Sequence, residues 1–342
     1  MQSRIHGDPD APSFYHLMSR TVADKREGGM MFFDAFEKNV FAKQMRQIAD
    51  FSGIEVLTWC MMDNHFHLLV RVPQREALIA DVLADGRKLF WTKMLALYDK
   101  AEVKEIRDEI EALEKEGQAR RAQAMVARFT DRMGDLAHFM QGLKFRFSVW
   151  FNRKYQRQGT LWHERFKSVL LEGDTAVLNK VAAYIDLNPI RAGLVTDPGD
   201  YHWSGYGQAV GGKKEARRGL SAVYGYDRSE WRQVAARYRA LLYLEGIEVR
   251  DAEGMIERAG VPEEDYYREL ANRGEESLPR RMARQVAYFS RGAAIGGKVF
   301  LEQVFERNRE KFGPRRKNGA RKFRGAIWKG SGMFSLRDLA ED

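Results

Sequence analysis

The chain of 342 residues is 44% hydrophobic and 31% charged, a composition typical of a folded protein with one large or two moderate domains. No run of about 18 uninterrupted apolar residues is present, which excludes a membrane-spanning helix. The single cysteine, Cys60, excludes an internal disulfide framework and a zinc site built from several thiolates. The first residues lack the apolar core of a secretory signal, so we expect a cytoplasmic protein.

In chain order, the hydrophobic pattern predicts a strand, a helix, two strands and a second helix. These elements cover residues 13–22, 34–53, 54–62, 65–72 and 75–98. The turn residues Asp63 and Asn64 separate the two consecutive strands, which favours a hairpin.

The next segment looks like an insertion between elements of the domain. Apolar residues recur there at steps of three and four among dense charge, and Gly117 interrupts the pattern. They are Val103, Ile106, Ile110 and Leu113. We expect an antiparallel helical hairpin over about residues 100–130, a structural arm that carries no chemistry.

A further strand over 160–172 and a helix over 174–188 complete the predicted order. Asp174 or Thr175 can cap this helix, and Pro189 ends it. Hairpin strands flanked by helices predict an α+β fold with a ferredoxin-like antiparallel sheet. After about residue 212 the pattern is mainly helical. We expect a first domain over 1–210 and a helical, basic C-terminal extension over 211–342.

The basic residues are concentrated in two runs. The net charge is +9 and the pI is near 9.5. Residues 309–329 hold nine Lys and Arg against one acid, with three aromatic residues between them. The segment "KFRFSVWFNRKYQRQG" (144–159) is also basic and aromatic and contains no acid. Cations neutralise phosphates and aromatic faces stack on unpaired bases, so nucleic acid is the leading partner. Each run alone fits equally well a solvated face whose aromatics point into a core.

Two histidines share one face of the strand over 65–72. Side chains alternate along a strand, so His65, His67 and Arg71 lie together with Leu69, opposite an apolar face that holds Phe66. The two imidazoles are roughly 6–7 Å apart at Cα, close enough to bind one ion. An open site of this kind suits Mg²⁺ or Mn²⁺ serving a phosphate, with a third ligand from elsewhere. The alternative is a pair of half-exposed surface histidines.

Tyr184 and Asn188 lie four residues apart on the last predicted helix of the first domain and point the same way. A tyrosine can act as a nucleophile and form a covalent intermediate, and a nearby cation would polarise the phosphoryl oxygen. The alternative is a core tyrosine above an asparagine that merely ends the helix. Tyr155 is the rival nucleophile, although a stacking or phosphate-contacting role suits it better.

Several motifs resemble the REP-associated tyrosine transposases of the HUH single-tyrosine superfamily. The motifs are "MDNHFHLLV", "FNRKYQRQGTLWHERFKS", "YIDLNPIRAGLV" and "DYHWSGY", and the resemblance covers roughly residues 13 to 210. The segments "YFSRGAAIGGKVFLEQVFERNREKFG" and "SLRDL" are similar to a C-terminal extension of some members. The arm and the length of the C-terminal part depart from the family pattern.

The resemblance implies a ferredoxin-like transposase domain that cleaves and joins single-stranded or hairpin DNA with a divalent metal. It assigns His65, His67 and Asn188 to the metal site and Tyr184 to the nucleophile of a 5′-phosphotyrosine intermediate. The expected nucleic-acid contacts are Arg153, Lys154, Tyr155, Arg157, Arg165, Arg315, Arg316 and Lys317. The protein would then be nucleoid-associated, and either a monomer or a homodimer fits.

Two other functions remain open at this point. A domesticated protein that binds hairpin DNA or RNA without cutting needs only the basic runs. A metal nuclease that uses water would make Tyr184 structural and leave no covalent intermediate.

Overall fold

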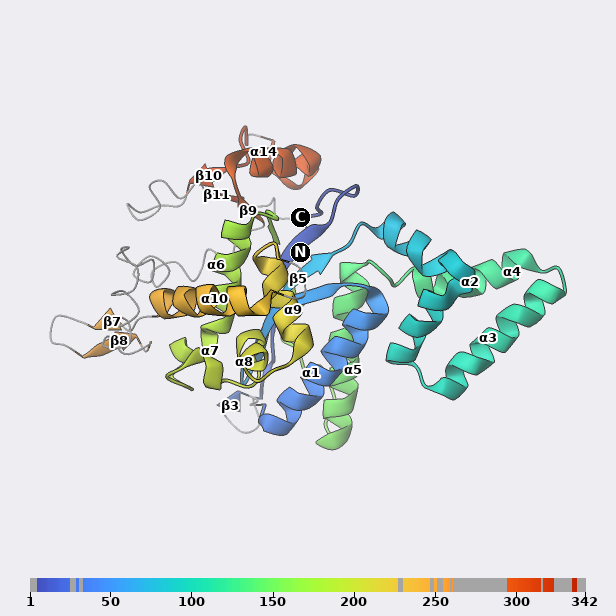
Figure 1. Ribbon diagram of the computed structural model, residues 1–342, viewed down its shortest axis with the longest axis horizontal. Helices are drawn as coiled ribbons and strands as arrows, with labels where there is room; N and C mark the ends of the chain where they lie inside the picture. The colour runs from blue at the N-terminus through green and yellow to red at the C-terminus, as the bar shows by residue number, and fades with distance from the viewer. Residues whose placement is uncertain are drawn as a thin grey trace.

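A computed structural model describes residues 5–24, 29–30, 33–226, 230–246, 249–250, 255–258, 260, 294–314, 316–322 and 334–336. The described residues form a seven-stranded sheet with helices on both faces (Figure 1). The α+β class predicted from the sequence is confirmed.

Four antiparallel strands form one side of the sheet in the order β6-β1-β5-β4, with β4 at the edge. They are β1 (Ser13–Arg20), β4 (Glu55–Met61), β5 (His65–Val72) and β6 (Lys167–Leu171). Helix α1 (Ala35–Ser52) connects β1 to β4, and α5 (Leu136–Lys154) precedes β6. This order and connectivity are those of the expected ferredoxin-like sheet.

The C-terminal part of the chain extends the same sheet beyond β6. Strand β9 (Ala294–Gly296) pairs parallel with β6, β11 (Phe334–Leu336) pairs with β9, and β10 (Arg321–Lys322) lies at the edge. The sequence pattern predicted mainly helix here and did not reveal these strands. Each has only two or three residues, which is too short for an alternating pattern to appear.

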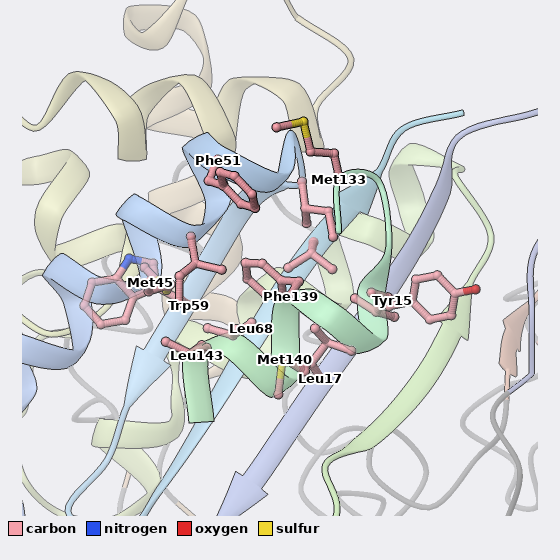
Figure 2. Close-up of a cluster of buried hydrophobic side chains, with 14 of the residues drawn as sticks. Tyr15, Leu17, Met45, Phe51, Trp59, Leu68, Met133, Phe139, Met140 and Leu143 are labelled. Atoms are coloured by element: carbon pink, nitrogen blue, oxygen red, sulfur yellow. The ribbon is translucent and has the colours of Figure 1, made fainter. Parts of the chain in front are cut away.

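Helices α1 and α5 cover one face of the sheet, and their packing forms the larger core (Figure 2). Phe51 of α1 and Phe139 and Leu143 of α5 are buried with Leu17 and Leu68 from the strands. Helix α1 begins with a capping box made by Asp34 and Glu37. The alternation predicted for β5 is confirmed, because Phe66, Leu68 and Val70 belong to this core while Leu69 faces the other way.

The opposite face packs against α6 (Thr175–Asp186), α9 (Lys214–Val223) and α10 (Trp231–Glu245). Leu69 of β5, Val181 of α6 and Tyr238 of α10 lie in this second core. Gly219 lets α9 approach the edge strand, since a Cβ there would lie 2.3 Å from the backbone oxygen of Leu57. Helix α9, which follows residue 210, therefore packs directly on the sheet, while the expected division at 210 stays a prediction.

The predicted helical arm is present. Helices α3 (Lys100–Lys115) and α4 (Ala119–Thr130) form a hairpin that projects from the side of the molecule after α2 (Arg75–Leu97) (Figure 1). Val103 and Ile110 form its narrow buried seam with Ala122 and Val126. No residue of α3 or α4 lines the cavity described below.

The strand expected over 160–172 is shorter than predicted. Only Lys167–Leu171 forms β6, and residues 160–166 form a loop beside the end of β1. The amide of Val22 donates to the Leu161 carbonyl at 3.0 Å, and the amide of His163 donates to the Arg20 carbonyl at 2.9 Å. Trp162 is buried in the larger core. This loop places charged side chains next to the histidine face of the sheet.

The remaining elements are short or peripheral. They are β2 (Ala23–Asp24), β3 (Gly29–Met30), α7 (Asn188–Arg191), α8 (Gly205–Val210), β7 (Val249–Arg250), β8 (Ile256–Arg258), α14 (Lys298–Arg307) and the 3₁₀ turns η1 (Pro198–Asp200) and η2 (Arg309–Lys311). Among the described helices, none combines the length and apolarity needed to cross a bilayer.

A buried carboxylate ties α6 to its neighbours. Asp186 is fully buried and accepts hydrogen bonds from the Thr58 hydroxyl at 2.9 Å, the Tyr238 hydroxyl at 2.6 Å and the Tyr206 amide at 3.1 Å. These donors lie on β4, α10 and α8. Burial raises the pKa of Asp186 to about 6, although the donated hydrogen bonds partly oppose the shift.

We expect Asp186 to make stability fall as pH rises from about 4 to 6. Its pKa is higher in the folded state than in the unfolded chain, so the folded protein binds the proton more tightly across that window. The ionisation of Asp186 lowers the free energy of unfolding by on the order of 3 kcal/mol, and this loss is complete above pH 6. Relative to Asp186→Asn, the wild type should lose this amount between pH 4 and 7.5, measured by urea unfolding. Parallel stability curves for the two proteins would contradict the assignment.

Candidate functional site

A cavity of about 520 Å³ opens at the ends of β1 and β5, beside the loop before β6 and the end of α6. His65, His67, Tyr184, Asn188 and Arg165, which the sequence analysis selected from distant parts of the chain, all line it. Arg20, His163 and Lys167 also line it. The structure therefore brings the predicted metal ligands and the predicted nucleophile to one place.

The two histidines of β5 are arranged as a pair. Their ring centres lie 5.1 Å apart with the planes nearly perpendicular. Nδ1 of His65 donates to Oδ1 of Asn64 at 2.7 Å, which leaves Nε2 with its lone pair. Nδ1 of His67 lies 2.9 Å from Nε2 of His16, and the tautomer in which His67 donates leaves Nε2 of His67 with its lone pair. A hydrogen bond on one ring nitrogen is how proteins orient a metal-binding histidine.

Burial keeps both imidazoles neutral at physiological pH. It lowers the pKa of His65 to about 4, with a smaller contribution from the positive charge of Arg20. The pKa of His67 is also well below its usual range, first because of burial and then because of His16 and His65 nearby. A neutral imidazole is the form that binds a metal ion, so the environment favours cation binding over protonation.

Tyr184 reaches this pair from α6. Its ring centre lies 5.8 Å from those of His67 and His16. The residue is only 3% exposed, so a substrate must enter the cavity to reach it. Burial raises the pKa of the phenol, and Arg191 opposes this because its guanidinium lies 5.0 Å from the ring centre. Arg191 also donates to the backbone oxygen of Tyr184 at 3.0 Å, which fixes the cation beside the ring.

Asn188 has a structural role that the sequence spacing also suggested. Its side-chain Nδ2 donates to the backbone oxygens of Tyr184 at 2.9 Å and Ile185 at 3.2 Å, where α6 ends. An amide nitrogen has no lone pair to offer a cation, so Oδ1 is the atom with which Asn188 would bind one.

The donor set fits an open site for a hard or borderline cation. Within the described residues, no group of three or more His, Cys, Asp and Glu side chains is arranged to hold a metal ion. If a cation binds in this cavity, His65 and His67 would supply two nitrogens and Asn188 an amide oxygen, which leaves positions for water and phosphate oxygens. Mg²⁺ and Mn²⁺ accept such incomplete protein coordination when a phosphate substrate completes it.

His16 is not among the site residues predicted from the sequence, although His16 is fully buried next to both His67 and Tyr184. Strand β1 pairs with β5 so that Met18 lies opposite His67 and His16 opposite Leu69. The alternation of "SFYHLMSR" places His16, Met18 and Arg20 on one face. That pattern, combined with a pairing register, is the signal that would have found His16.

The basic segment at the end of α5 lies outside this cavity. The Tyr155 hydroxyl donates to Oε1 of Glu37 at 2.7 Å, and Lys154 forms an ion pair with the same carboxylate. Arg157 donates to the side chain of Asn152 at 3.3 Å, and Arg153 is exposed. None of the four expected contacts in this segment lines the cavity. Tyr155, the rival nucleophile, therefore sits apart from the histidine pair.

The expected contacts in the basic tail have different surroundings. Arg315 lies outside the described residues. The guanidinium of Arg316 donates to the backbone oxygens of Asn318 and Gly319, both at 3.0 Å, and lies 5.0 Å from the ring centre of Phe312. Lys317 is exposed. The Arg316 side chain thus holds the turn, and contact with nucleic acid stays a prediction for these residues.

The chain has a distant structural match among known proteins. No protein-family model and no curated protein matches the chain. Among solved structures, the chain is similar to a REP-associated tyrosine transposase bound to a REP hairpin, with a TM-score of 0.36 and 11% sequence identity. The match covers 62% of this chain and 86% of that chain. A likeness this distant carries no functional argument.

The environment of the pair predicts that His65 and His67 stay neutral at pH 5.5, where an ordinary imidazole is mostly charged. The ring-proton signals should be followed by NMR from pH 8 to 4, with His65→Gln and His67→Gln used to assign them. The expected result is no titration near pH 6.5 and a midpoint for His65 near 4. A midpoint near 6.5 for either residue would show that the pair is solvated and not enclosed.

Proposed function

We propose that the protein is a metal-dependent strand transferase that cleaves and joins single-stranded DNA, including the strand beside a hairpin, through a covalent tyrosine intermediate. The observation that carries this proposal is the meeting of Tyr184 with His65 and His67 at one cavity, from elements far apart in the sequence. A protein that only binds nucleic acid does not require a phenol and two neutral imidazoles at the same cavity.

In the proposed reaction, Oη of Tyr184 attacks the scissile phosphorus. The new bond joins the phenol oxygen to phosphorus, and the bond from phosphorus to the 3′-oxygen breaks. The phenol proton leaves and the 3′-oxygen gains a proton, which gives a 5′-phosphotyrosine and a free 3′-hydroxyl. The reverse step with another 3′-end joins strands.

The residues around Tyr184 support this step in distinct ways. Arg191 favours the phenolate, because its charge opposes the rise in pKa caused by burial. Arg165 and Lys167 line the cavity and can neutralise the DNA backbone. A divalent cation, when bound by His65, His67 and Asn188, would polarise the phosphoryl oxygen. His16 and Asn64 orient the two imidazoles.

The second candidate is a protein that binds hairpin DNA or RNA without cutting it. The 3% exposure of Tyr184 favours this candidate, because an enclosed phenol can be a core residue. The two candidates differ in their need for metal. A binder should keep its affinity in EDTA and release no fragment when Mn²⁺ is added.

The covalent intermediate gives the first test. A hairpin oligonucleotide with a single-stranded 3′ extension, labelled at its 3′-end, should become attached to the protein in Mn²⁺ and resist denaturing electrophoresis. The same oligonucleotide labelled at its 5′-end should yield a free fragment. Tyr184→Phe should abolish the adduct, because the nucleophilic oxygen is absent.

Tyr155→Phe is the matched control, since it removes the other phenol considered and leaves the cavity intact. If the adduct is lost in Tyr155→Phe and kept in Tyr184→Phe, the nucleophile is Tyr155 and the assignment to Tyr184 is wrong. Cleavage with no adduct in any protein would show hydrolysis by water.

The ligand assignment predicts that Mn²⁺ binding falls by about 10-fold or more in His65→Ala and in His67→Ala, because each removes one nitrogen donor. Free Mn²⁺ can be measured by EPR without DNA. His138→Ala is the control, since that histidine bonds Asp135 near the start of α5. Affinity should change little between pH 7.5 and 5.5, because the imidazoles are already neutral. Equal Mn²⁺ affinity in the wild type and the three histidine variants would contradict the assignment of His65 and His67 as metal ligands.

A further inference from the structure

A second hollow lies beside the candidate site. It has a volume of about 800 Å³ and runs along one face of α5 against the loop over 159–166. We call it the α5 groove. Phe145 and Val149 line it and are 67% and 51% exposed, although the opposite face of α5 is buried. The two side chains are four residues apart on α5 and so form one exposed apolar patch along the hollow, and such a patch can mark a surface for a ligand.

The α5 groove shares a wall with the candidate site. Glu164 and Arg165 line both hollows. Glu164 also forms an exposed ion pair with Lys167 at 3.3 Å, which leaves Arg165 as the cation between the two hollows. A DNA strand whose phosphate lies near His65 and Tyr184 would therefore pass Arg165 and continue into the groove.

The floor of the groove combines a fixed cation with an aromatic ring. Nζ of Lys144 donates to the backbone oxygen of Glu164 at 2.7 Å and lies 5.7 Å from the ring centre of Trp162. The Trp162 indole donates to the backbone oxygen of Lys144 at 3.1 Å, so α5 and the loop hold each other in place. Burial lowers the pKa of Lys144 to about 8. An anion bound nearby would favour its charged form.

From this arrangement we propose that the α5 groove binds the unpaired base of a nucleotide next to the scissile phosphate, with the base stacked on Phe145. The proposal rests on the proposed function, since it places this base relative to the cleaved bond. Two features select DNA as the occupant: the continuity with the candidate site through Arg165, and the positive charge of Lys144 and Arg165 beside an apolar wall. The volume lies within the roughly 300–1,000 Å³ of ligand sites.

The test uses the hairpin substrate with each base near the cut replaced in turn by an abasic nucleotide. Binding is measured by fluorescence anisotropy in EDTA, so that no cleavage is required. For the wild type, one abasic position within about two nucleotides of the cut should weaken binding about 10-fold. Phe145→Ala should weaken binding of intact DNA by the same factor. The abasic nucleotide at that position should then cause no further loss of affinity in the Phe145→Ala variant.

Three controls accompany this comparison. Phe145→Trp should restore both the affinity and the abasic effect, since it keeps a stacking ring. Leu95→Ala removes another exposed apolar side chain, on α2, and should leave both unchanged. Because Phe145 is exposed, Phe145→Ala should keep the wild-type melting temperature, which circular dichroism can check.

The outcomes separate this proposal from the proposed function. If the wild type forms the adduct but Phe145→Ala keeps the full abasic effect, the base site is overturned and the catalytic proposal stands. If the abasic effect depends on Phe145 but no adduct forms in Mn²⁺, the groove still binds a base, whereas catalysis and the placement of that base beside a cleaved bond are both overturned. If Phe145→Ala instead converts a dimer to a monomer in light scattering and leaves DNA binding unchanged, the groove's occupant is a second copy and the base site is overturned.

Discussion

The antiparallel pairing of β1 with β5 is the constraint on which the site depends. Its register puts Met18 opposite His67, so that His16 and His67 lie close enough for a 2.9 Å contact between ring nitrogens. In the same pairing, the side chains of Leu17 and Leu68 face the core under α1 and α5. A shift of β5 by one residue would move His65 and His67 into that core, so burial of the apolar face of β5 fixes its histidine face as well.

The position of Tyr184 depends on a different set of interactions. Two residues further along α6, Asp186 accepts hydrogen bonds from Thr58, Tyr206 and Tyr238. These bonds hold the C-terminal end of α6 against β4, α8 and α10, and Asn188 caps the helix immediately afterwards. Asp186 has no basic partner among the residues that the structure describes, and a buried carboxylate of this kind is costly unless its hydrogen bonds are satisfied. The network therefore restrains the helix turn that carries the phenol beside the histidines.

The sequence predicted those parts of the fold that repeat over several residues. Alternation revealed β5 and both its faces, and spacing of three and four residues revealed the arm. His16 was missed because its importance depends on the register of β1 against β5, which one sequence does not show. Residues 160–166 were assigned to a strand because alternation cannot distinguish a strand from a loop whose Trp162 enters the core. The role of Arg316 in holding a turn was likewise not visible from a run of basic residues.

The central claim is that His65, His67 and Tyr184 surround one bound cation, and pulsed EPR of Mn²⁺ in the protein tests it most directly. Protein made with ¹⁵N-histidine and ring-deuterated tyrosine should show coupling of Mn²⁺ to two histidine nitrogens and modulation from nearby deuterons. Each histidine variant should lose one nitrogen coupling, and Tyr184→Phe should lose the deuterium modulation. Manganese that shows no histidine nitrogen coupling, or deuterium modulation that persists in Tyr184→Phe, would contradict the account.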